Sequence, residues 1–243
     1  MKIALISDIH GNLEALETVI ADALALGVDS FACLGDIVGY GADPVACLER
    51  IRSLDPIAII KGNHDAYSAE DLELSSFNPI AREAAYWTRD QLGDERRAWL
   101  RDLPLTAQLS SDVLLVHATP LNPASWNYVR FIDEGALALD EQMARLCCYG
   151  HTHMAMAFRL LGNDVELLTK AEYDLTTGDR WLVNVGSVGQ PRDGDWRAGW
   201  TMLDTEADML TLRRLEYDVG ACQEKILAAG LPERLATRLG DGR

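Results

Sequence analysis

The sequence predicts an α/β protein, a four-layer α/β/β/α sandwich of two mixed β-sheets packed together with flanking helices. Residues 2–60 alternate buried strand-like runs with helical patterns, which is typical of parallel strands joined by crossover helices. Residues 155–215 contain short strand-like runs separated by turn residues, which favours a second, mainly antiparallel sheet. With 243 residues, 48% of them hydrophobic, the chain is long enough to bury a large core.

The N-terminal part predicts three strands and two helices in alternation. Lys2–Ser7, Ser30–Leu34 and Ile57–Ile60 are apolar runs of strand length. Apolar residues from Leu13 to Leu24 recur at helical spacing, and Asp43-Pro44 places an N-cap and a first-turn proline before the next helix. The order β-α-β-α-β predicts parallel strands, and ligands of such sheets bind at the C-terminal strand ends.

The remaining elements follow from the same periodicities. Helices are expected at 79–102, 133–146, 222–229 and 231–239, with Trp87 and Trp99 available for the core. A polar, aromatic loop is expected at 120–130. Strands are expected at 105–109, 113–116, 147–149, 155–161, 165–168, 181–185, 200–203 and 209–215. The chain shows no internal repeat or linker, so residues 1–243 are expected to form a single domain.

Composition limits the binding partners and the cellular compartment that can be expected for the protein. The net charge of −16 disfavours binding to duplex nucleic acid, although bound divalent cations would reverse the field inside a pocket. The N-terminus lacks a signal-peptide core and no apolar run approaches the length of a membrane span, so we expect a cytoplasmic protein. The five cysteines lack metal-binding spacing and are expected to be buried, reduced thiols. The sequence does not indicate an oligomeric state.

All five histidines follow short apolar runs. They are His10, His64, His117, His151 and His153. Histidines used for packing or for surface charge would be scattered along the chain. This pattern instead predicts imidazoles at strand ends that face a common site.

Taken singly, most polar residues at these strand ends also have a structural explanation. Asp8 and His10 are predicted to point to the same side of extended backbone, but a capping aspartate and a half-buried histidine fit as well. Asp36 alone is a turn residue, and Asn63 alone forms an Asx-turn. The segment Gly150–His153 is more specific, because two imidazoles one residue apart both need polar partners. A divalent transition metal provides such a partner for neutral imidazole.

The donor set as a whole favours metal binding. Its members are Asp8, His10, Asp36, Asn63, His117, His151 and His153. These side chains suffice for two octahedral ions that share one bridging carboxylate. Mixed nitrogen and oxygen ligands suit Mn, Fe, Zn or Ni better than Mg or Ca, and we expect Mn first. The lack of cysteine in the set argues against a structural zinc site.

The order Asp-x-His, Gly-Asp, Gly-Asn-His-Asp, His and Gly-His-x-His resembles the calcineurin-like metallophosphoesterase superfamily. Five blocks spread from residue 8 to residue 153 argue against a chance match. Asp8–Asn12 and Asn184–Arg192 further resemble the compact bacterial and archaeal phosphodiesterase-type branch. The resemblance covers nearly the whole chain, including the tail at 215–239.

The resemblance implies a role for each motif residue. Asp8, His10 and His153 would hold one ion, Asn63, His117 and His151 the other, and Asp36 would bridge them. His64 would face the scissile phosphate and stabilise or protonate the leaving oxygen, while Asp65 would orient His64. Val116 stands where relatives often have glycine, and Val185 where proline is common. Neither departure changes the expected chemistry.

The implied activity is hydrolysis by two ions. Ions about 3.5–4 Å apart can hold a bridging hydroxide at neutral pH, which would attack phosphorus in line with the leaving group. The expected substrates are small phosphate esters, most of all phosphodiesters or nucleotides. Trp126 or Tyr128 is expected either to stack on a base or to cap the core. Arg192 is expected to form a structural ion pair, with phosphate binding as the alternative.

Three other functions are compatible with this family. A non-catalytic binding module would have lost ligand histidines or His64, and this chain keeps them all. The charge of −16 and the lack of a large additional domain disfavour a nuclease. A serine/threonine protein phosphatase stays open on the sequence alone.

Overall fold

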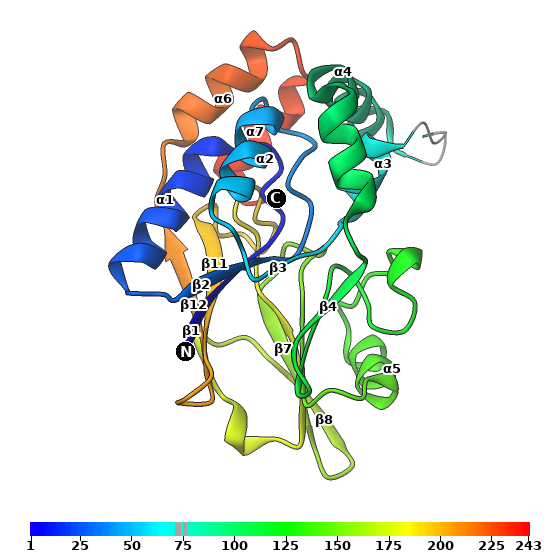
Figure 1. Ribbon diagram of the computed structural model, residues 1–243, viewed down its shortest axis with the longest axis vertical. Helices are drawn as coiled ribbons and strands as arrows, with labels where there is room; N and C mark the ends of the chain where they lie inside the picture. Colours follow the sequence, from blue (N-terminus) through cyan, green and yellow to red (C-terminus); the bar gives the residue numbers. More distant parts are fainter. Residues whose placement is uncertain (71–73, 75–76) are drawn as a thin grey trace.

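The computed structural model describes residues 1–70, 74 and 77–243, which form the predicted two-sheet sandwich (Figure 1). The strands are β1 (Lys2–Ile6), β2 (Ser30–Cys33), β3 (Ala58–Ile59), β4 (Thr106–Ser110), β5 (Val113–Val116), β6 (Leu146–Tyr149), β7 (Met156–Leu161), β8 (Asp164–Leu168), β9 (Glu172–Asp174), β10 (Arg180–Asn184), β11 (Ala198–Asp204) and β12 (Met209–Leu215). The helices are α1 (Leu13–Ala25), α2 (Pro44–Ser53), α3 (Asn63–Ala69), α4 (Pro79–Asp102), α5 (Ile132–Glu141), α6 (Val219–Ala228) and α7 (Glu233–Asp241), with short 3-10 helices η1 (Pro123–Ser125) and η2 (Leu175–Thr177).

Both sheets are mixed, as predicted. The first has the order β3-β2-β1-β11-β12-β9 and the second β4-β5-β6-β10-β7-β8. Strands β1, β2 and β3 are parallel, and so are β5, β6 and β10. The expectation that 200–203 and 209–215 belong to the second sheet is wrong. Strand β11 pairs antiparallel with β1, on the edge of β1 that β2 does not cover, and β12 follows it.

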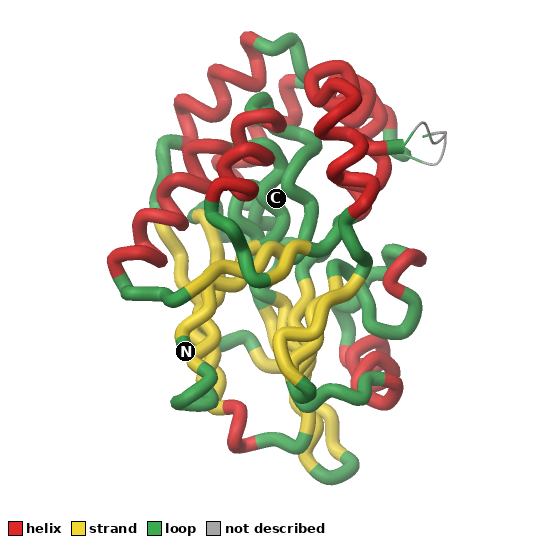
Figure 2. Tube along the Cα trace, viewed as in Figure 1, coloured by secondary structure: helices red, strands yellow, loops and turns green. Residues whose placement is uncertain are grey.

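Three apolar interfaces separate the four layers. Alternate residues of β1 face opposite sides, so that Ala4 and Ile6 pack toward the helices and Ile3 and Leu5 toward the second sheet. In the second sheet, Cys148 lies between the sheets while its neighbours in β6 pack in a third cluster with α5. Figure 2 shows the α-helices outside the strands, with α5 beside the second sheet and the other α-helices beside the first.

Several element boundaries differ from the prediction. Gly93 has φ +66°, which interrupts α4 between its two halves. The helix expected at 133–146 ends at Glu141, and Leu146 already begins β6. Helix α3 and strand β9 were not predicted from the sequence. Trp87 and Trp99 pack partly buried against the core, as expected.

Other expectations concern the cysteines and membranes. All five cysteines are buried and free, as predicted, and burial raises the pKa of Cys148 to about 12. Among the described residues, no helix combines the length and the apolar character that crossing a membrane requires.

Candidate metal centre

The candidate site lies at the C-terminal ends of strands from both sheets. The segments that follow β1, β2 and β3 contribute from the first sheet, and those that follow β5 and β6 from the second. Because parallel strands end at the same edge, these segments meet where the two sheets pack together. All seven predicted metal-binding residues are buried there, as are His64 and Asp65.

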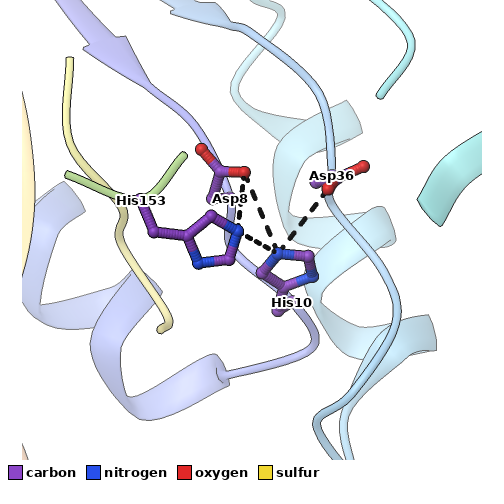
Figure 3. A group of neighbouring side chains, drawn as sticks. All are labelled: Asp8, His10, Asp36 and His153. Carbon is purple, nitrogen blue, oxygen red and sulfur yellow. Dashed lines mark hydrogen bonds and ion pairs between the residues drawn. The ribbon is translucent and has the colours of Figure 1, made fainter. Parts of the chain in front are cut away.

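One group of donors surrounds Asp8. The Nε2 atom of His153 lies 3.2 Å from Asp8 Oδ1 and 3.1 Å from Nε2 of His10 (Figure 3). The same atom of His10 lies 3.6 Å from Asp36 Oδ2. Two ligands at right angles on one ion, each about 2.1 Å away from it, are about 3 Å apart. The spacing of these atoms therefore suits a single ion.

A second group shares Asp36. His117 Nε2 lies 3.3 Å from Asp36 Oδ2, and a ring nitrogen of His151 lies within 4.8 Å of the donor atoms of Asp36 and His117. Asp36 Oδ2, His117 Nε2 and Asn63 Oδ1 are buried and have no hydrogen-bond partner among the described residues. Unpartnered buried polar atoms are costly unless a ligand satisfies them. A second cation would satisfy all three.

The ring nitrogens of the four candidate ligand histidines are already assigned by hydrogen bonds. Each ring donates one N–H to a main-chain carbonyl, which can only accept, so the other nitrogen is free to bind a metal. The pairs are His10 Nδ1 with Val38 O (3.1 Å), His117 Nδ1 with Leu34 O (2.7 Å), His153 Nδ1 with Gln190 O (2.6 Å) and His151 Nε2 with Trp126 O (2.9 Å). In neutral rings, the free nitrogens of His10 and His153 face each other as lone pairs, which a cation between them would stabilise.

Most of the donors have left-handed backbone. The φ angles are +53° for Asp8, +51° for His10, +53° for Asp36, +63° for His151 and +58° for His153. The expected extended conformation at Asp8 and His10 is therefore wrong, although the two side chains do converge. Such conformations are unfavourable for residues other than glycine and concentrate at functional sites. The fold thus holds strained backbone at the points where the donors meet.

Asp65 supports the segment after β2 instead of the His64 ring. Its Oδ2 accepts N–H bonds from Asp36 (2.7 Å) and Gly62 (3.0 Å), and its Oδ1 accepts one from Ile37 (2.9 Å). No hydrogen bond joins Asp65 to the His64 ring in the described part of the chain. The expectation that Asp65 orients His64 is therefore wrong. The Asp65 carboxylate instead accepts hydrogen bonds from main-chain N–H groups that position Asp36.

The His64 ring packs against the rings of both His10 and Tyr40, which also contact each other. Its centre is 4.9 Å from that of His10 and 4.3 Å from that of Tyr40. A Cβ atom on Gly39 would lie 2.6 Å from His64 Nδ1, so only glycine leaves space for the ring. Tyr40, whose φ is +62°, was not predicted as a residue of the site. Its place between Gly39 and Gly41 was the available signal.

Burial and neighbouring charges set the protonation of the site. Burial lowers the pKa of His10, His151 and His153, which keeps these rings in the neutral form that binds metals. Burial acts in the same direction on His117, but the Asp36 carboxylate raises its pKa to about 9. Without a metal, a protonated His117 therefore places a positive charge beside Asp36, and metal binding must release that proton.

A cleft of about 260 Å³ opens beside the donors. Tyr128 stacks on His151 with ring centres 4.3 Å apart and 20° between the planes, and the tyrosine is 41% exposed. It therefore forms a wall of the cleft and does not cap the core. The lining residues are Tyr40, Asn63, His64, Tyr67, Phe77, Asn78, Ala81, Trp126, Tyr128 and His151.

The contacts of the Arg192 side chain differ from those predicted from the sequence. Its Nη2 donates to the amide oxygen of Gln190 at 2.7 Å, and its guanidinium lies 5.7 Å from the centre of the Tyr40 ring. It forms no ion pair with any described residue, so the predicted structural ion pair is wrong. The guanidinium is held by an uncharged acceptor and an aromatic ring.

Comparison with known proteins assigns the family. Residues 1–208, which include every candidate donor, match the family model of the calcineurin-like phosphoesterase superfamily domain. The chain belongs to this superfamily. The structure of a metallophosphoesterase from Sphaerobacter thermophilus is 39% identical and superposes with a TM-score of 0.88, covering 100% of this chain and 99% of that one.

Two relatives of this calcineurin-like phosphoesterase differ in the length of the chain that they match. The uncharacterized protein MJ0912 of Methanocaldococcus jannaschii is 37% identical over 246 residues, 99% of this chain and 98% of its own length. The symmetrical bis(5'-nucleosyl)-tetraphosphatase of Glaesserella parasuis is 30% identical over 123 residues, 49% of this chain and 44% of that enzyme. The family predicted from the motifs is confirmed.

Proposed function

We propose that this calcineurin-like phosphoesterase is a hydrolase that uses two metal ions to cleave phosphodiesters or nucleotide-type phosphate esters. One observation carries the proposal. Asp36 Oδ2, Asn63 Oδ1 and His117 Nε2 are all buried without a hydrogen-bond partner among the described residues, and Asp36 belongs to both donor groups. Membership of the superfamily supports hydrolysis of a phosphate ester.

Each ion has its own set of donors in this proposal. Asp8, His10 and His153 would hold one ion and Asn63, His117 and His151 the other, with Asp36, a member of both donor groups, available to each. The mixture of imidazole nitrogen and oxygen donors favours Mn, with Fe, Zn or Ni as alternatives. Bound there, the ions would activate a water molecule and offset negative charge on the phosphate.

His64 acts on the leaving group. It is absent from both donor groups, and its ring lines the cleft with Nδ1 against the Gly39 backbone. Burial lowers its pKa to about 4, so the ring is neutral near pH 7 and carries one N–H. With that proton on Nε2, the ring donates a hydrogen bond to the leaving oxygen as negative charge develops there.

The cleft favours a small substrate with a planar group. Its walls are largely aromatic, which suits contact with a planar group. The match of half of this chain to a tetraphosphatase supports nucleotide-type esters. The net charge of −16 continues to disfavour duplex nucleic acid as a partner.

The two alternatives are a serine/threonine protein phosphatase and a non-catalytic binding module. The cleft of about 260 Å³ favours a small ester over a phosphoprotein. A module without catalysis has no need of His64 beside two complete donor groups.

The test is reconstitution. Metal-stripped protein is supplied with Mn, Fe, Zn or Ni and assayed on bis-p-nitrophenyl phosphate and on p-nitrophenyl phosphate. Turnover of the diester supports the proposal, and turnover of the monoester alone points to a phosphatase. Metal binding without turnover of either ester would contradict the proposal and favour the non-catalytic binding module.

Two further expectations are part of the proposal. We propose that residues 1–243 form one domain, because both sheets contribute donors to the site, and limited proteolysis tests this. The cytoplasmic location stays a prediction, which fractionation of cells that express the protein would test.

A further inference from the structure

One of the four candidate ligand histidines is held by an exposed loop. Three of these rings donate to carbonyls of buried residues. The fourth, His151, donates from Nε2 to the carbonyl of Trp126, a half-buried residue between β5 and α5. Of residues 120–130, all of which the structure describes, only Val129 is buried. The nitrogen of His151 that remains for a metal is therefore oriented by a segment that lies largely in solvent.

Tyr128 of the same loop stacks on the His151 ring. The ring centres lie 4.3 Å apart, with 20° between the planes. The hydroxyl of Tyr128 forms no hydrogen bond with any described residue, so the tyrosine acts on the imidazole through its ring alone. The χ2 torsion of histidine is intrinsically broad, and a near-parallel neighbour at this distance narrows the orientations of the imidazole.

The residues that follow Tyr128 fix it in this position. The carbonyl of Val129 accepts a hydrogen bond from the Tyr149 hydroxyl at 2.9 Å, which ties the loop to β6. The Glu134 carboxylate accepts the main-chain N–H of Arg130 at 2.6 Å, which ties it to α5. The Cζ atom of Arg130 lies 4.4 Å from the centre of the Tyr128 ring. Both sides of the loop's contact with His151 are therefore defined by the fold.

The loop acts on one donor group and not on the other. Its Trp126 ring lies 6.0 Å from the ring of His117, the second imidazole of the group that shares Asp36. In the described part of the chain, no hydrogen bond, ion pair or ring contact joins residues 120–130 to His10 or His153. The two candidate ion sites thus differ in what supports their ligands.

We propose that Tyr128 is a positioning residue for the second ion, the one that Asn63, His117 and His151 would hold. This rests on the proposed two-ion function and adds a form of control to it, because the affinity of the second ion depends on the loop while that of the first does not. An imidazole already held in its binding orientation loses less conformational freedom when the ion binds. Removing a group that orients a metal ligand typically weakens metal binding by about 10- to 100-fold.

Titration of the metal-stripped, full-length protein with Mn, followed by calorimetry, tests the proposal. Tyr128→Ala should weaken one of two binding events by ~10-fold or more and leave the other within ~2-fold of the wild type. Tyr128→Phe keeps the ring and should stay within ~3-fold at both events. Tyr86→Ala is the matched control and should change neither. Tyr86 is also exposed and has an arginine, Arg89, 5.3 Å from its ring centre, but it lies on α4 outside the lining of the cleft.

Asn63→Ala identifies which event belongs to the second ion, because it removes a proposed ligand of that ion alone. In the Asn63→Ala background, Tyr128→Ala should have no further effect on the event that remains. If Tyr128→Ala does not fold by circular dichroism, Tyr128→Leu replaces it, and loss of the aromatic ring should still weaken the second event by ~3-fold or more.

The outcomes separate this proposal from the proposed function. Equal weakening of both events, no weakening of either, or a Tyr128→Phe variant as weak as Tyr128→Ala overturns the role of the Tyr128 ring. A protein that shows the expected pattern but hydrolyses no ester contradicts the proposed function alone. A wild type that binds a single ion contradicts the two-ion function, and the role of Tyr128 then holds only if Asn63→Ala and Tyr128→Ala both weaken that ion.

Discussion

Asp36 Oδ2 and His117 Nε2 lie 3.3 Å apart, and neither atom has a hydrogen-bond partner in the described part of the chain. Asp36 follows β2 of the first sheet, whereas His117 follows β5 of the second. The pair therefore joins the two sheets, and it forms only when they are packed together. A cation bound by both side chains would stabilise the folded state as well as supply the chemistry.

Removing the metal should lower the melting temperature. An ion at 100 times its Kd stabilises the folded state by about 2.7 kcal/mol. In a protein of this size that corresponds to a Tm shift of about 5–10 °C. Calorimetry with chelator and then with added Mn measures the shift. Ca, which prefers all-oxygen sites, is the control ion and should restore little. A Tm that changes with neither the chelator nor added Mn would contradict metal binding at this site.

His64→Ala should separate catalysis from metal binding. The ring is outside both donor groups, so metal content should stay near the wild-type level while kcat falls by about 10²–10⁴-fold. His10→Ala is the comparison, because His10 is a proposed ligand and its loss should remove metal. Loss of metal from His64→Ala would show that its assigned role is wrong.

Gly39→Ala should disturb His64 directly. Gly39 has φ +91°, and a Cβ there would lie 2.6 Å from His64 Nδ1. Gly27→Ala is a matched control, since Gly27 also has positive φ, +69°, but no atom lies within 4 Å of its added Cβ. Both variants should lose about 1–2 kcal/mol of stability from backbone strain. Only Gly39→Ala should also lose activity, by about tenfold or more. Equal effects on activity would contradict the packing described.

Asp65→Asn should act through Asp36. An amide nitrogen cannot accept, so at least one main-chain N–H bound by Asp65 would lose its partner, at a cost of about 1–3 kcal/mol. We expect a lower Tm and weaker metal binding, measured by titration with Mn. Asp29→Asn is the control, because Asp29 also accepts a main-chain N–H, from Lys2 at 2.7 Å, but at an exposed position. A fall in kcat with unchanged metal affinity would favour the orienting role.

The donor set could be predicted because each member is a polar residue at the end of an apolar run. Asp36 and His117, for example, lie within two residues of the ends of predicted strands, and parallel strands bring such positions to one edge. The same patterns predicted the parallel order of β1, β2 and β3. Local periodicity was enough for these features.

Other features depend on contacts that no local pattern records. The pairing of β11 with β1 joins residues about 200 positions apart, so the assignment of strands to sheets failed. The target of Asp65 is a loop 27 to 29 residues earlier in the chain.

The central claim is that two cations bind where the sheets meet, and elemental analysis of reconstituted protein tests it most directly. The wild type, loaded with Mn and freed of excess by gel filtration, should retain about two ions per chain. Asp36→Asn, which alters the shared ligand, should retain one or none, whereas Asp90→Asn on the exposed side of α4 should retain both. A wild-type protein that holds no transition metal, or an Asp36→Asn variant that holds as much as the wild type, would contradict the account.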